Sequence, residues 1–526
     1  MPSVDNPSTS SGNYVVEALR RFGEYGDREA IVSAARRITY ADLVREIREL
    51  VTALRSHGVG PESVVAVLTG NQPEAMSLHC AAHLLGCRTV WMAGYMPARE
   101  QPDYLRRSGA DFLVYDTRRY GEAGAELLDG DWKGTALCIG PGGRGPDLFA
   151  GIPGGPAEEA DLVPGPGPSS LFYTGGTTGR AKLVHHEERF YLALLAIGAA
   201  WLASGAPTLR HLTINGFSHV SGHMTNLLML FTGSTVVLHA GFDIPQWLAA
   251  VEAERATSTL LTPAQLYEVL DHPGLESADL SGLLLLNIGG AAVSPSRLRQ
   301  AAERFGPVVR LVYGLTEAAF VTEYRGVVPD PDHPERLGSC GVLFADSRVE
   351  IRDEDGRVLG PGGTGEVWVA GSLVMSGYWD EPPEDGPVRD GWLRTGDVGR
   401  VDEDGYLYLV DRSKDMIVTG RGAANVYSKP VEDVLASHPG VRAAAVVGVP
   451  DEAMGEAVVA YVVRVPGAEV TAEDLRALVT AELRAYSAPG AVEFVDALPL
   501  TGMGKVDKKA LRERWADGCG VREGAR

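Results

Sequence analysis

The sequence predicts an α/β protein with a large N-terminal domain of parallel sheets flanked by helices, a β-rich subdomain and a small α+β domain at the C-terminus. Three observations predict this fold. Short apolar runs alternate with segments whose apolar residues recur every three or four positions. After about Gly338 the sequence changes to short strands separated by turn residues. The 526 residues suffice for two to four domains, because a single core stops growing at about 250–300 residues.

The first elements follow a polar stretch, residues 1–12, which we expect to be a disordered tail. The apolar spacing within Ala41–His57 predicts a helix with one face against the core. Thr39 and Asp42 stand three residues apart, as the two partners of a capping box do. Gly58 is a suitable end for this helix.

The next segments alternate between strand and helix. Ser63–Leu68 reads as a buried strand, a helical run continues to Leu85, and Arg88–Met92 is the next strand. Strand–helix–strand alternation predicts parallel sheets covered by helices. The strand pattern recurs at Phe112–Tyr115, Thr235–Leu238, Thr257–Leu261, Leu283–Ile288 and Val308–Leu311.

The C-terminal third of the chain is predicted to contain hairpins and then a separate domain. The DG pairs at 355–356 and 404–405 favour hairpin turns. A boundary near residue 411 separates a large domain, residues 13–411, from a small one, residues 412–526. The β-rich part has predicted strands at Glu350–Arg352, Glu366–Ala370 and Tyr406–Val410. The small domain has predicted helices at 430–438 and 472–486 and predicted strands near 442–449, 457–465 and 491–496.

Composition argues against several functional classes. Lys plus Arg is 48 and Asp plus Glu is 69, a net charge of −21 that disfavours binding to nucleic acid or an anionic membrane by bulk charge. The longest apolar stretch, Tyr191–Ala203, is shorter than the roughly 20 residues of a membrane span. The polar N-terminus lacks the apolar region of a secretory signal, so we expect a cytoplasmic protein. The five scattered cysteines lack the spacing of a disulfide framework or zinc site: Cys80, Cys87, Cys138, Cys340 and Cys519.

The segment with the strongest chemical signal is Phe172–Lys182 (FYTGGTTGRAK). Its glycines allow backbone N–H groups to turn toward an anion, and its threonines and lysine add donors and positive charge. A triphosphate needs these groups. The loop is not a Walker A motif, because the GK[ST] ending is absent. The alternative is a flexible surface loop, with His185 and His186 as its solvated edge.

The loop TGGTTGRAK resembles the signature loop of the adenylate-forming superfamily, which includes acyl- and aryl-CoA ligases, adenylation domains and luciferases. Further motifs follow in the family's order over residues 13–515, with the texture of actinobacterial-type fatty-acid or aryl acid–CoA ligases. They are Gly289-Gly290-Ala291, Tyr313-Gly314-Leu315-Thr316-Glu317, Gly365-Glu366, Gly377-Tyr378-Trp379, Arg394-Thr395-Gly396-Asp397, Asp411-Arg412-Ser413-Lys414-Asp415 and Gly504-Lys505.

The resemblance implies an ATP-dependent, AMP-forming ligase that joins a carboxylate to the α-phosphate of ATP and expels pyrophosphate. Because two anions must approach each other, positive charge is needed between them. The resemblance gives this catalytic role to Lys505, carried by a small domain that is mobile. Lys414 occupies the family's hinge position, where backbone angles change between domain orientations. His219 falls where ligases place an aromatic residue or a histidine beside the acyl carboxylate.

The resemblance also assigns the nucleotide site. Asp397 would accept both ribose hydroxyls with its two oxygens, and Arg412 would contact the ribose or a phosphate. Tyr313 would stack on adenine. Glu317 would ligate the Mg²⁺ ion that bridges the phosphates, as a hard oxygen ligand. The remaining predicted nucleotide contacts are Thr174, Gly175, Gly176, Thr177, Thr178, Gly179, Lys182, Gly289, Gly290, Ala291, Gly314 and Thr316.

Several of these residues have simpler explanations when the motifs are set aside. Lys505 is then a solvated lysine beside Lys508 and Lys509. Asp397 is an ordinary turn residue, and Tyr313 is a core tyrosine at the end of a strand.

The segment around His219 allows other chemistries. His219 and His223 have the spacing of a zinc pair, but no third ligand is obvious. Residues 216–220 (GFSHV) nearly form a nucleophile elbow, but the last glycine is missing, so a hydrolase is disfavoured. A hydrogen-bonded core histidine is the remaining alternative for His219.

Two stretches depart from the family pattern. In the signature loop, usually SGTTGxPKG, Gly175, Ala181 and Leu183 replace Ser, Pro and Gly. The phosphate donors remain, so we expect ATP binding. After the hinge, SGGxNVYPxEVE becomes Thr419–Glu432 (TGRGAANVYSKPVE), where Arg421 replaces the second glycine. Because this loop lines the family's pantetheine channel, the use of CoA is an open question.

Three functions remain from the sequence, all with a small-molecule partner. The first is an acyl- or aryl-acid–CoA ligase with an altered channel. The second is a ligase-like diazotase of natural-product biosynthesis that activates nitrite with ATP and diazotises an amino-aryl substrate without CoA. The third is a non-catalytic binding protein derived from a ligase, which the presence of Lys505, Asp397, Arg412 and Glu317 argues against.

Overall fold

The computed structural model describes residues 13–151, 165, 167–175, 180–420, 424–451, 454–502 and 504–522. The chain forms two compact units. The first comprises Met1–Thr259, Thr316–Ala319 and Ser372–Val388, and the second comprises Leu260–Leu315, Phe320–Gly371 and Arg389–Arg526. The expected tail, residues 1–12, lies outside the described residues. The expected boundary near residue 411 falls inside the second unit and stays a prediction.

A largely parallel sheet forms one core of the first unit. Its strands are β3 (Val64–Leu68), β4 (Arg88–Trp91), β5 (Phe112–Asp116), β6 (Thr135–Ile139), β7 (Ser169–Gly175), β8 (Ala181–Glu187) and β18 (Gly377–Tyr378). They follow the order β18-β8-β7-β4-β3-β5-β6. The neighbours from β7 to β6 are parallel, whereas β8 is antiparallel to β7 and to β18. The structure therefore confirms the predicted parallel arrangement.

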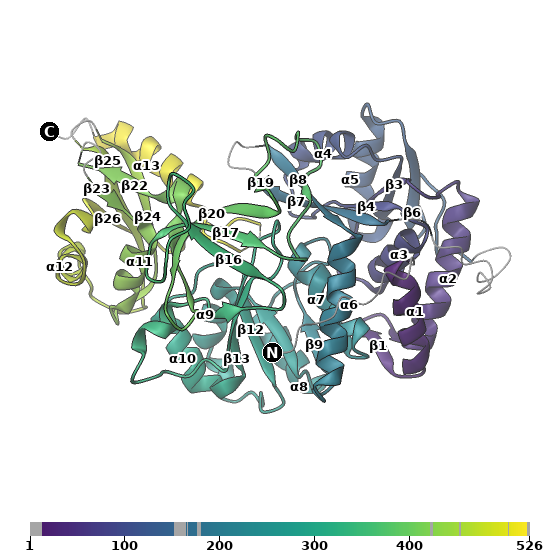
Figure 1. Cartoon of the computed structure of the whole chain (residues 1–526), viewed down its shortest axis with the longest axis horizontal. Helices are drawn as coiled ribbons and strands as arrows, with labels where there is room; N and C mark the ends of the chain where they lie inside the picture. The colour runs from purple at the N-terminus through teal and green to yellow at the C-terminus, as the bar shows by residue number, and fades with distance from the viewer. Residues whose placement is uncertain are drawn as a thin grey trace. The chain divides into compact units, whose positions relative to one another are not determined.

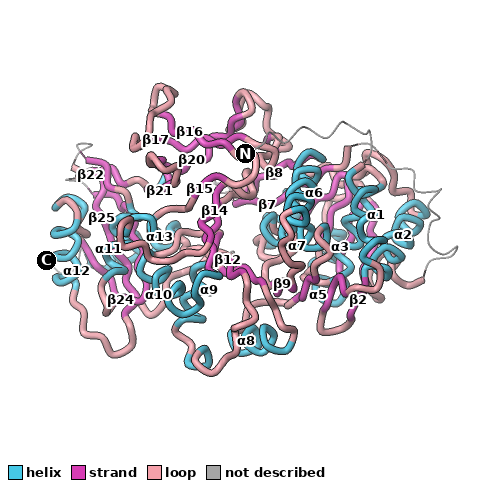
Figure 2. Tube along the Cα trace, turned by 60° about the horizontal axis from the view of Figure 1, so that its bottom comes forward, coloured by secondary structure: helices cyan, strands magenta, loops and turns pink. Residues whose placement is uncertain are grey.

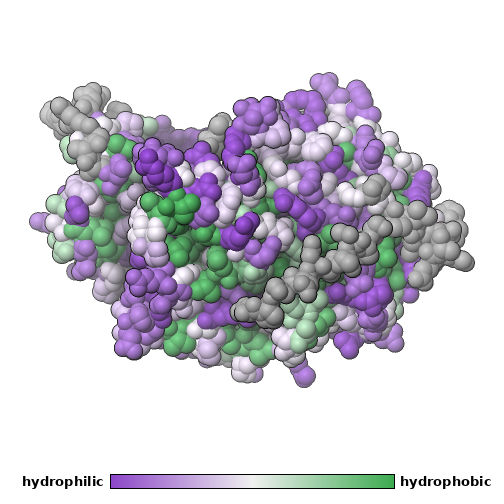
Figure 3. Space-filling view, viewed as in Figure 1, coloured by the Kyte–Doolittle hydropathy of each residue, from purple (hydrophilic) through white to green (hydrophobic). Residues whose placement is uncertain are grey.

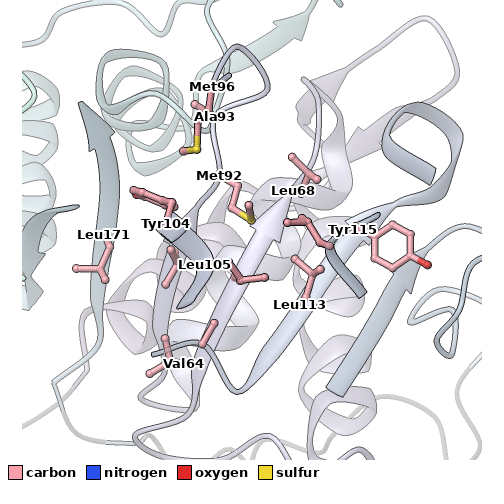
Figure 4. Close-up of a cluster of buried hydrophobic side chains, with 14 of the residues drawn as sticks. Val64, Leu68, Met92, Ala93, Met96, Tyr104, Leu105, Leu113, Tyr115 and Leu171 are labelled. Atoms are coloured by element: carbon pink, nitrogen blue, oxygen red, sulfur yellow. The ribbon is translucent and has the colours of Figure 1, made fainter. Parts of the chain in front are cut away.

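Apolar side chains from this sheet pack against a neighbouring helix. The helices around it are α3 (Pro73–Leu84), α4 (Gln101–Arg107) and α5 (Thr117–Asp129). Figure 4 shows Leu68 on β3, Leu113 on β5 and Leu171 on β7 in one buried cluster with Tyr104 and Leu105 of α4. Strand β7, which contributes Leu171 to this cluster, ends at Gly175 within the signature loop.

The first long helix, α2 (Tyr40–Ser56), begins and ends as the sequence predicts. The Thr39 side chain accepts a hydrogen bond from the Asp42 backbone N–H, and the Asp42 carboxylate accepts one from the Thr39 N–H. This is the predicted capping box. Gly58 follows the helix with φ +84°, a left-handed conformation that glycine adopts without a steric penalty.

A second group of strands and helices completes the first unit. The strands are β1 (Glu29–Val32), β2 (Arg37–Thr39), β9 (Arg210–Thr213), β10 (Thr235–Leu238) and β11 (Ser258–Leu261), of which the last two residues, Leu260 and Leu261, belong to the second unit. The helices are α1 (Tyr14–Tyr25), α6 (Glu188–Ala203), α7 (Val220–Phe231) and α8 (Ile244–Ala253). Strands β11, β9, β10 and β1 pair in parallel, and β2 is antiparallel to β1. Figure 1 shows α6 beside α7, and α1 packs against both.

The apolar run Tyr191–Ala203 belongs to α6, which is partly buried within the first unit. Among the described residues, no helix is long and apolar enough to cross a membrane. On the face drawn in Figure 3, hydrophilic and hydrophobic residues are interspersed. Cys80, Cys87, Cys138 and Cys340 are free thiols.

The second unit begins with strands that continue the α/β pattern. Its elements here are α9 (Pro263–Leu270), β12 (Leu285–Gly289), α10 (Pro295–Phe305), β13 (Val309–Tyr313), β14 (Thr322–Arg325) and β15 (Val342–Leu343). Strands β12 and β13 are parallel. The β-rich part consists of β16 (Arg348–Arg352), β17 (Gly365–Ala370), β20 (Trp392–Val401) and β21 (Leu407–Arg412). The predicted hairpins are confirmed, because β16 pairs antiparallel with β17 and β20 with β21.

The last part of the chain is α+β, as predicted. Its elements are β22 (Ile417–Thr419), β23 (Ala424–Val426), α11 (Ser428–Ser437), β24 (Val441–Asp451), β25 (Gly455–Arg464), α12 (Ala472–Glu482), β26 (Ala491–Phe494) and α13 (Lys508–Arg522). Figure 2 shows α11 and α12 near β24 and β25. The predicted helix 472–486 is too long, because Leu483 adopts an extended backbone and packs against the buried cluster of these elements.

Candidate active site

The described ends of the signature loop lie on two paired strands of the first unit. Thr174 and Gly175 end β7, and Lys182 lies on β8 directly opposite Thr174. Gly175 is opposite Ala181. The predicted contacts Gly176, Thr177, Thr178 and Gly179 lie outside the described residues. The hydroxyl of Thr174 and the ammonium of Lys182 therefore belong to neighbouring strand positions at the edges of the loop.

Tyr378 connects the predicted phosphate-binding lysine to the predicted metal ligand. The Lys182 Nζ lies 4.0 Å from the centroid of the Tyr378 ring, a cation–π contact, and 3.6 Å from the Glu381 Oε1. The Tyr378 hydroxyl donates a hydrogen bond of 3.0 Å to Glu317 Oε1. The sequence motif that contains Tyr378 predicts no contact for this side chain, so its position between Lys182 and Glu317 becomes visible only in the structure.

Two hydrogen bonds hold the backbone carbonyl groups of Thr316 and Glu317. The His186 Nε2–H donates to the Thr316 carbonyl oxygen at 2.8 Å, and the Met375 N–H donates to the Glu317 carbonyl oxygen at 2.8 Å. Burial lowers the pKa of His186 to about 4, so the ring is neutral at physiological pH. His186 is 1% exposed, which corrects its prediction as a solvated edge of the loop. Adjacent residues of a strand point to opposite faces of the sheet, so the pair His185 and His186 on β8 indicates that one of the two rings faces the core.

Glu317 fits the predicted magnesium role. It is a half-buried carboxylate held by the Tyr378 hydroxyl through one oxygen. Among the described residues, no three His, Cys, Asp or Glu side chains gather as a metal cage. Mg²⁺ in nucleotide sites needs no such cage, because it keeps water ligands and binds one or two carboxylates together with substrate phosphates. A single placed carboxylate suits that ion.

His219 lies at the N-terminus of α7. Its Nδ1 accepts a hydrogen bond from the Ser221 backbone N–H, so the side chain caps the helix. The Tyr95 ring lies 6.5 Å away, centroid to centroid. The side chain is half-buried rather than enclosed in the core. Its predicted place beside the substrate carboxylate stays a prediction.

His223 has a different environment from His219. It is fully buried, and its Nδ1–H donates to the Phe217 carbonyl oxygen at 3.2 Å. Its ring lies 4.5 Å from that of His79 and 4.2 Å from that of Phe217. One nitrogen of each member of the suggested zinc pair is thus occupied by a hydrogen bond, and an aromatic cluster encloses His223.

The second unit contains a buried carboxylate held by two donors. Asp397, on β20, is 4% exposed. The Tyr313 hydroxyl donates to its Oδ2 at 2.6 Å, and the Arg412 Nε lies 2.9 Å from its Oδ1. Arg412 is the residue directly opposite Asp397 on β21. The structure therefore brings together three residues predicted from separate motifs, and this trio is called the carboxylate clamp below.

The clamp adjoins two strand ends. Tyr313 ends β13, and Gly289 ends the neighbouring parallel strand β12, opposite Val312. A Cβ atom on Gly289 would lie 2.5 Å from the Val312 Cγ2, which explains the glycine. Gly290 follows with φ +88° and Ala291 is exposed. In open α/β sheets, ligands bind at the carboxyl ends of the strands.

Tyr313 is a buried residue with a polar function. It is 8% exposed, and burial together with the Asp397 carboxylate raises the pKa of its hydroxyl well above its usual value. The hydroxyl therefore remains a hydrogen-bond donor at physiological pH. Gly314 follows it at the strand end. Tyr313 is therefore both a buried core residue and a member of the carboxylate clamp. Its stacking on adenine stays a prediction.

Lys505 lies in a tight turn before α13. The Lys505 carbonyl oxygen accepts a hydrogen bond of 2.7 Å from the Thr501 N–H, and the Gly504 N–H donates to the Thr501 carbonyl oxygen at 2.8 Å. The side chain of Lys505 is exposed. Lys414, at the predicted hinge, lies in a short 3-10 helix, Ser413–Asp415. Partial burial and the nearby Arg412 lower the pKa of Lys414.

Comparison with known proteins gives two family matches. Residues 19–379 match the AMP-binding enzyme family, and residues 430–505 match the AMP-binding enzyme C-terminal domain. The chain is 36% identical to the medium/long-chain-fatty-acid–CoA ligase FadD8 of Mycobacterium tuberculosis, over 97% of this chain and 91% of that protein. It is 35% identical to the feruloyl-CoA synthase of an Amycolatopsis species, over 91% of this chain and 94% of that protein.

Solved structures share the fold. The amide bond synthetase McbA from Marinactinospora thermotolerans superposes with a TM-score of 0.85 and 37% identity, covering 95% of this chain and 99% of that one. ATP-bound MatB from Rhodopseudomonas palustris superposes with a TM-score of 0.83 and 27% identity, covering 96% and 99%. The similar proteins thus include ones named for CoA ligation and one named for amide bond synthesis.

Proposed function

Because the chain belongs to the AMP-binding enzyme family of adenylate-forming ligases, we propose that it activates an acyl or aryl carboxylate with ATP and Mg²⁺ and transfers the acyl group to CoA. It is an ATP-dependent, AMP-forming ligase by family. The transfer to CoA is proposed from FadD8 and feruloyl-CoA synthase, which are named as a CoA ligase and a CoA synthase.

The observation that carries this proposal is the carboxylate clamp. A buried carboxylate is costly unless charged or polar donors compensate it, and Tyr313 and Arg412 supply both kinds of donor to Asp397. Each carboxylate oxygen has two acceptor positions, so one remains on each oxygen for a vicinal diol. A ribose with free 2′ and 3′ hydroxyls satisfies this arrangement.

In the first reaction, a carboxylate oxygen of the acid attacks the α-phosphorus of ATP, and the bond to pyrophosphate breaks. Lys505 contributes positive charge between the two anions, and the Thr174 hydroxyl and Lys182 bind phosphate oxygens. Glu317 would hold Mg²⁺, which neutralises phosphate charge when bound. In the second reaction, the CoA thiol attacks the acyl carbonyl, loses its proton, and AMP leaves.

A second candidate acceptor follows from the segment after the hinge. Arg421 replaces a family glycine there, and residues 421–423 lie outside the described part of the chain. McbA, which is 37% identical to this chain, is named an amide bond synthetase, so an amine is a reasonable acceptor. The diazotase hypothesis, in which nitrite is activated and an amino-aryl substrate is diazotised, predicts turnover without CoA as well.

One comparison of substrates tests the proposal. AMP release would be measured with carboxylic acids plus CoA, with carboxylic acids plus an amine, and with nitrite plus an amino-aryl acid. Formation of a thioester supports the CoA ligase. Formation of an amide supports an amine as the acceptor. Nitrite-dependent turnover without CoA supports the diazotase. Absence of AMP formation and of ATP binding in every mixture would favour the non-catalytic binding protein.

A further inference from the structure

Lys508 is a largely buried cation three residues after the predicted catalytic lysine. It is the first residue of α13, and its side chain is 19% exposed. Its Nζ donates a hydrogen bond of 2.5 Å to the Ser428 Oγ and lies 2.9 Å from the Glu432 Oε1. Burial alone would lower the pKa of Lys508, but the Glu432 and Asp411 carboxylates raise it above its usual value. The side chain is therefore a fixed ammonium.

Ser428 links this ammonium to the strand that enters the hinge. Ser428 is fully buried at the start of α11, and its backbone N–H donates to Asp411 Oδ2. Its hydroxyl donates to Asp411 Oδ1 at 3.1 Å and accepts from Lys508. Both the hydroxyl group and the backbone N–H of Ser428 are therefore engaged in hydrogen bonds. A proline, which the family pattern has at this position, would remove both the N–H and the hydroxyl.

Asp411 is next to the carboxylate clamp. It precedes Arg412 on β21 and is opposite Val398, the residue after Asp397 on β20. Burial raises the pKa of Asp411, and the positive charge of Lys508 opposes this effect. Lys508, Ser428 and Asp411 form a hydrogen-bonded network, and Asp411 at one end of it is the neighbour of Arg412, which contacts Asp397.

The other end of the network holds the turn that carries Lys505. The Asp507 side chain accepts a hydrogen bond of 3.0 Å from the Ala510 N–H, as a helix cap does, and the Asp507 N–H donates to the Pro499 carbonyl oxygen at 2.8 Å. The Lys505 N–H donates to the Thr501 Oγ1 at 3.3 Å. Lys508 follows Lys505 by three residues, so anchoring Lys508 restricts where the turn can lie.

We propose that Ser428 and Lys508 are positioning residues that tie the Lys505 turn to the Asp411–Arg412 strand. This inference rests on the proposed adenylation reaction. The network connects the turn that carries Lys505, through Lys508 and Ser428, to Asp411, the residue before Arg412 of the carboxylate clamp. Glu432 completes it, because its Oε1 also accepts from the Val446 N–H at 2.8 Å and so attaches the network to β24.

The test uses the full chain and a pair of matched controls. The variants are Lys508→Met, Lys508→Arg and Ser428→Ala. The controls are Lys509→Met, the exposed neighbour that pairs with Glu513, and Ser437→Ala, an exposed serine on α11. Acid-dependent ATP–pyrophosphate exchange gives kcat and KM, and thermal unfolding identifies variants that are simply unstable.

A displacement of a catalytic group by about 1 Å can reduce the rate roughly 100-fold. We therefore expect Lys508→Met to lower kcat by about 10- to 100-fold with the KM for ATP within about twofold, and Lys508→Arg to restore most of the rate. Ser428→Ala should have a smaller effect in the same direction. Equal loss in the controls, or unchanged kcat in Lys508→Met at a temperature where it is folded, would overturn the proposal.

A second measurement does not depend on the reaction. Amide hydrogen exchange at Lys505 and Asp507, measured without ligands, should be faster in Lys508→Met and Ser428→Ala than in the wild type and both controls. Unchanged exchange would refute the positioning role even if the wild type proved inactive. Conversely, faster amide hydrogen exchange in the variants, in a protein that shows no ATP–pyrophosphate exchange, would support the network and refute only the proposed function.

Discussion

Among single residues, Asp397 is the one on which the proposed nucleotide site depends most. Its carboxylate is buried, and its two oxygens are contacted by the Tyr313 hydroxyl and by Arg412. Three different sequence motifs contain these residues, and the family resemblance assigns all three residues to the nucleotide. Because the three side chains are in direct contact, a substitution at any one of them tests the predicted role of the other two.

The Asp397→Asn variant should bind ATP poorly while remaining folded, because the amide keeps the shape of the side chain but loses the charge and one acceptor oxygen. Losing hydrogen bonds to a charged group costs about 1.5–3 kcal/mol, so the KM for ATP should rise roughly 10- to 100-fold in the exchange assay. Asp404→Asn, in the exposed turn between β20 and β21, is the matched control. An unchanged KM would remove the ribose role from Asp397.

The Tyr313→Phe variant should be less stable than the wild type. It removes the hydrogen bond to the buried Asp397 carboxylate, with an expected loss of about 1.5–3 kcal/mol in the free energy of unfolding. The quantity is measured by denaturant unfolding, with Tyr324→Phe on the neighbouring strand β14 as control. Equal stabilities of Tyr313→Phe and the wild type would show that the hydroxyl contributes no net stabilisation.

At the scale of elements, the ends of β12 and β13 place the proposed nucleotide contacts. A methyl group at Gly289 would approach the Val312 Cγ2 to 2.5 Å, so the Gly289→Ala variant must shift one strand end. Overpacking of this kind typically costs about 1–3 kcal/mol. We expect lower stability and a higher KM for ATP. Gly241→Ala, where a methyl group would meet no atom within 4 Å, is the control.

The elements themselves were predictable because local patterns determine them. The period of apolar residues predicted α2, and the alternation of elements predicted the parallel pairing of β3 with β4. The end of α12 was not predictable in this way, since Leu483 leaves the helix to pack against a cluster from distant segments.

The site residues were predictable where a contiguous motif carries them. Asp397 and Glu317 belong to such motifs, so the resemblance identified them. The supporting partners were not predictable, because they are contacts between residues far apart in the chain. His186 reaches Thr316 across 130 positions, and Lys508 reaches Ser428 across 80.

At the scale of the whole molecule, buried histidines make stability depend on pH. His79, His83 and His223 are fully buried, and the rings of His79 and His83 lie 4.0 Å apart. Burial lowers the pKa of His83 to about 3, and burial lowers the pKa of His211 to about 4. In the unfolded chain these groups titrate near 6.5. The unfolded state therefore binds more protons than the folded state below that pH.

The thermal midpoint should accordingly fall as the pH is lowered from about 6.5 toward 5, and change little from this cause above about 7. The His79→Gln variant should show a shallower fall, because one fewer proton is taken up on unfolding. His333→Gln, an exposed histidine, is the control. A midpoint that is constant between these pH values would contradict the neutral buried cluster.

We propose that this chain forms an adenylate from ATP and a carboxylic acid, with Lys505 supplying positive charge between the two anions. The most direct measurement is acid-dependent ATP–pyrophosphate exchange by the wild type and by Lys505→Ala, at equal folded concentrations. We predict exchange with a suitable acyl or aryl acid, and a loss of roughly 100-fold or more in kcat for Lys505→Ala with ATP binding retained. Exchange that proceeds equally in both proteins would contradict the catalytic role of Lys505.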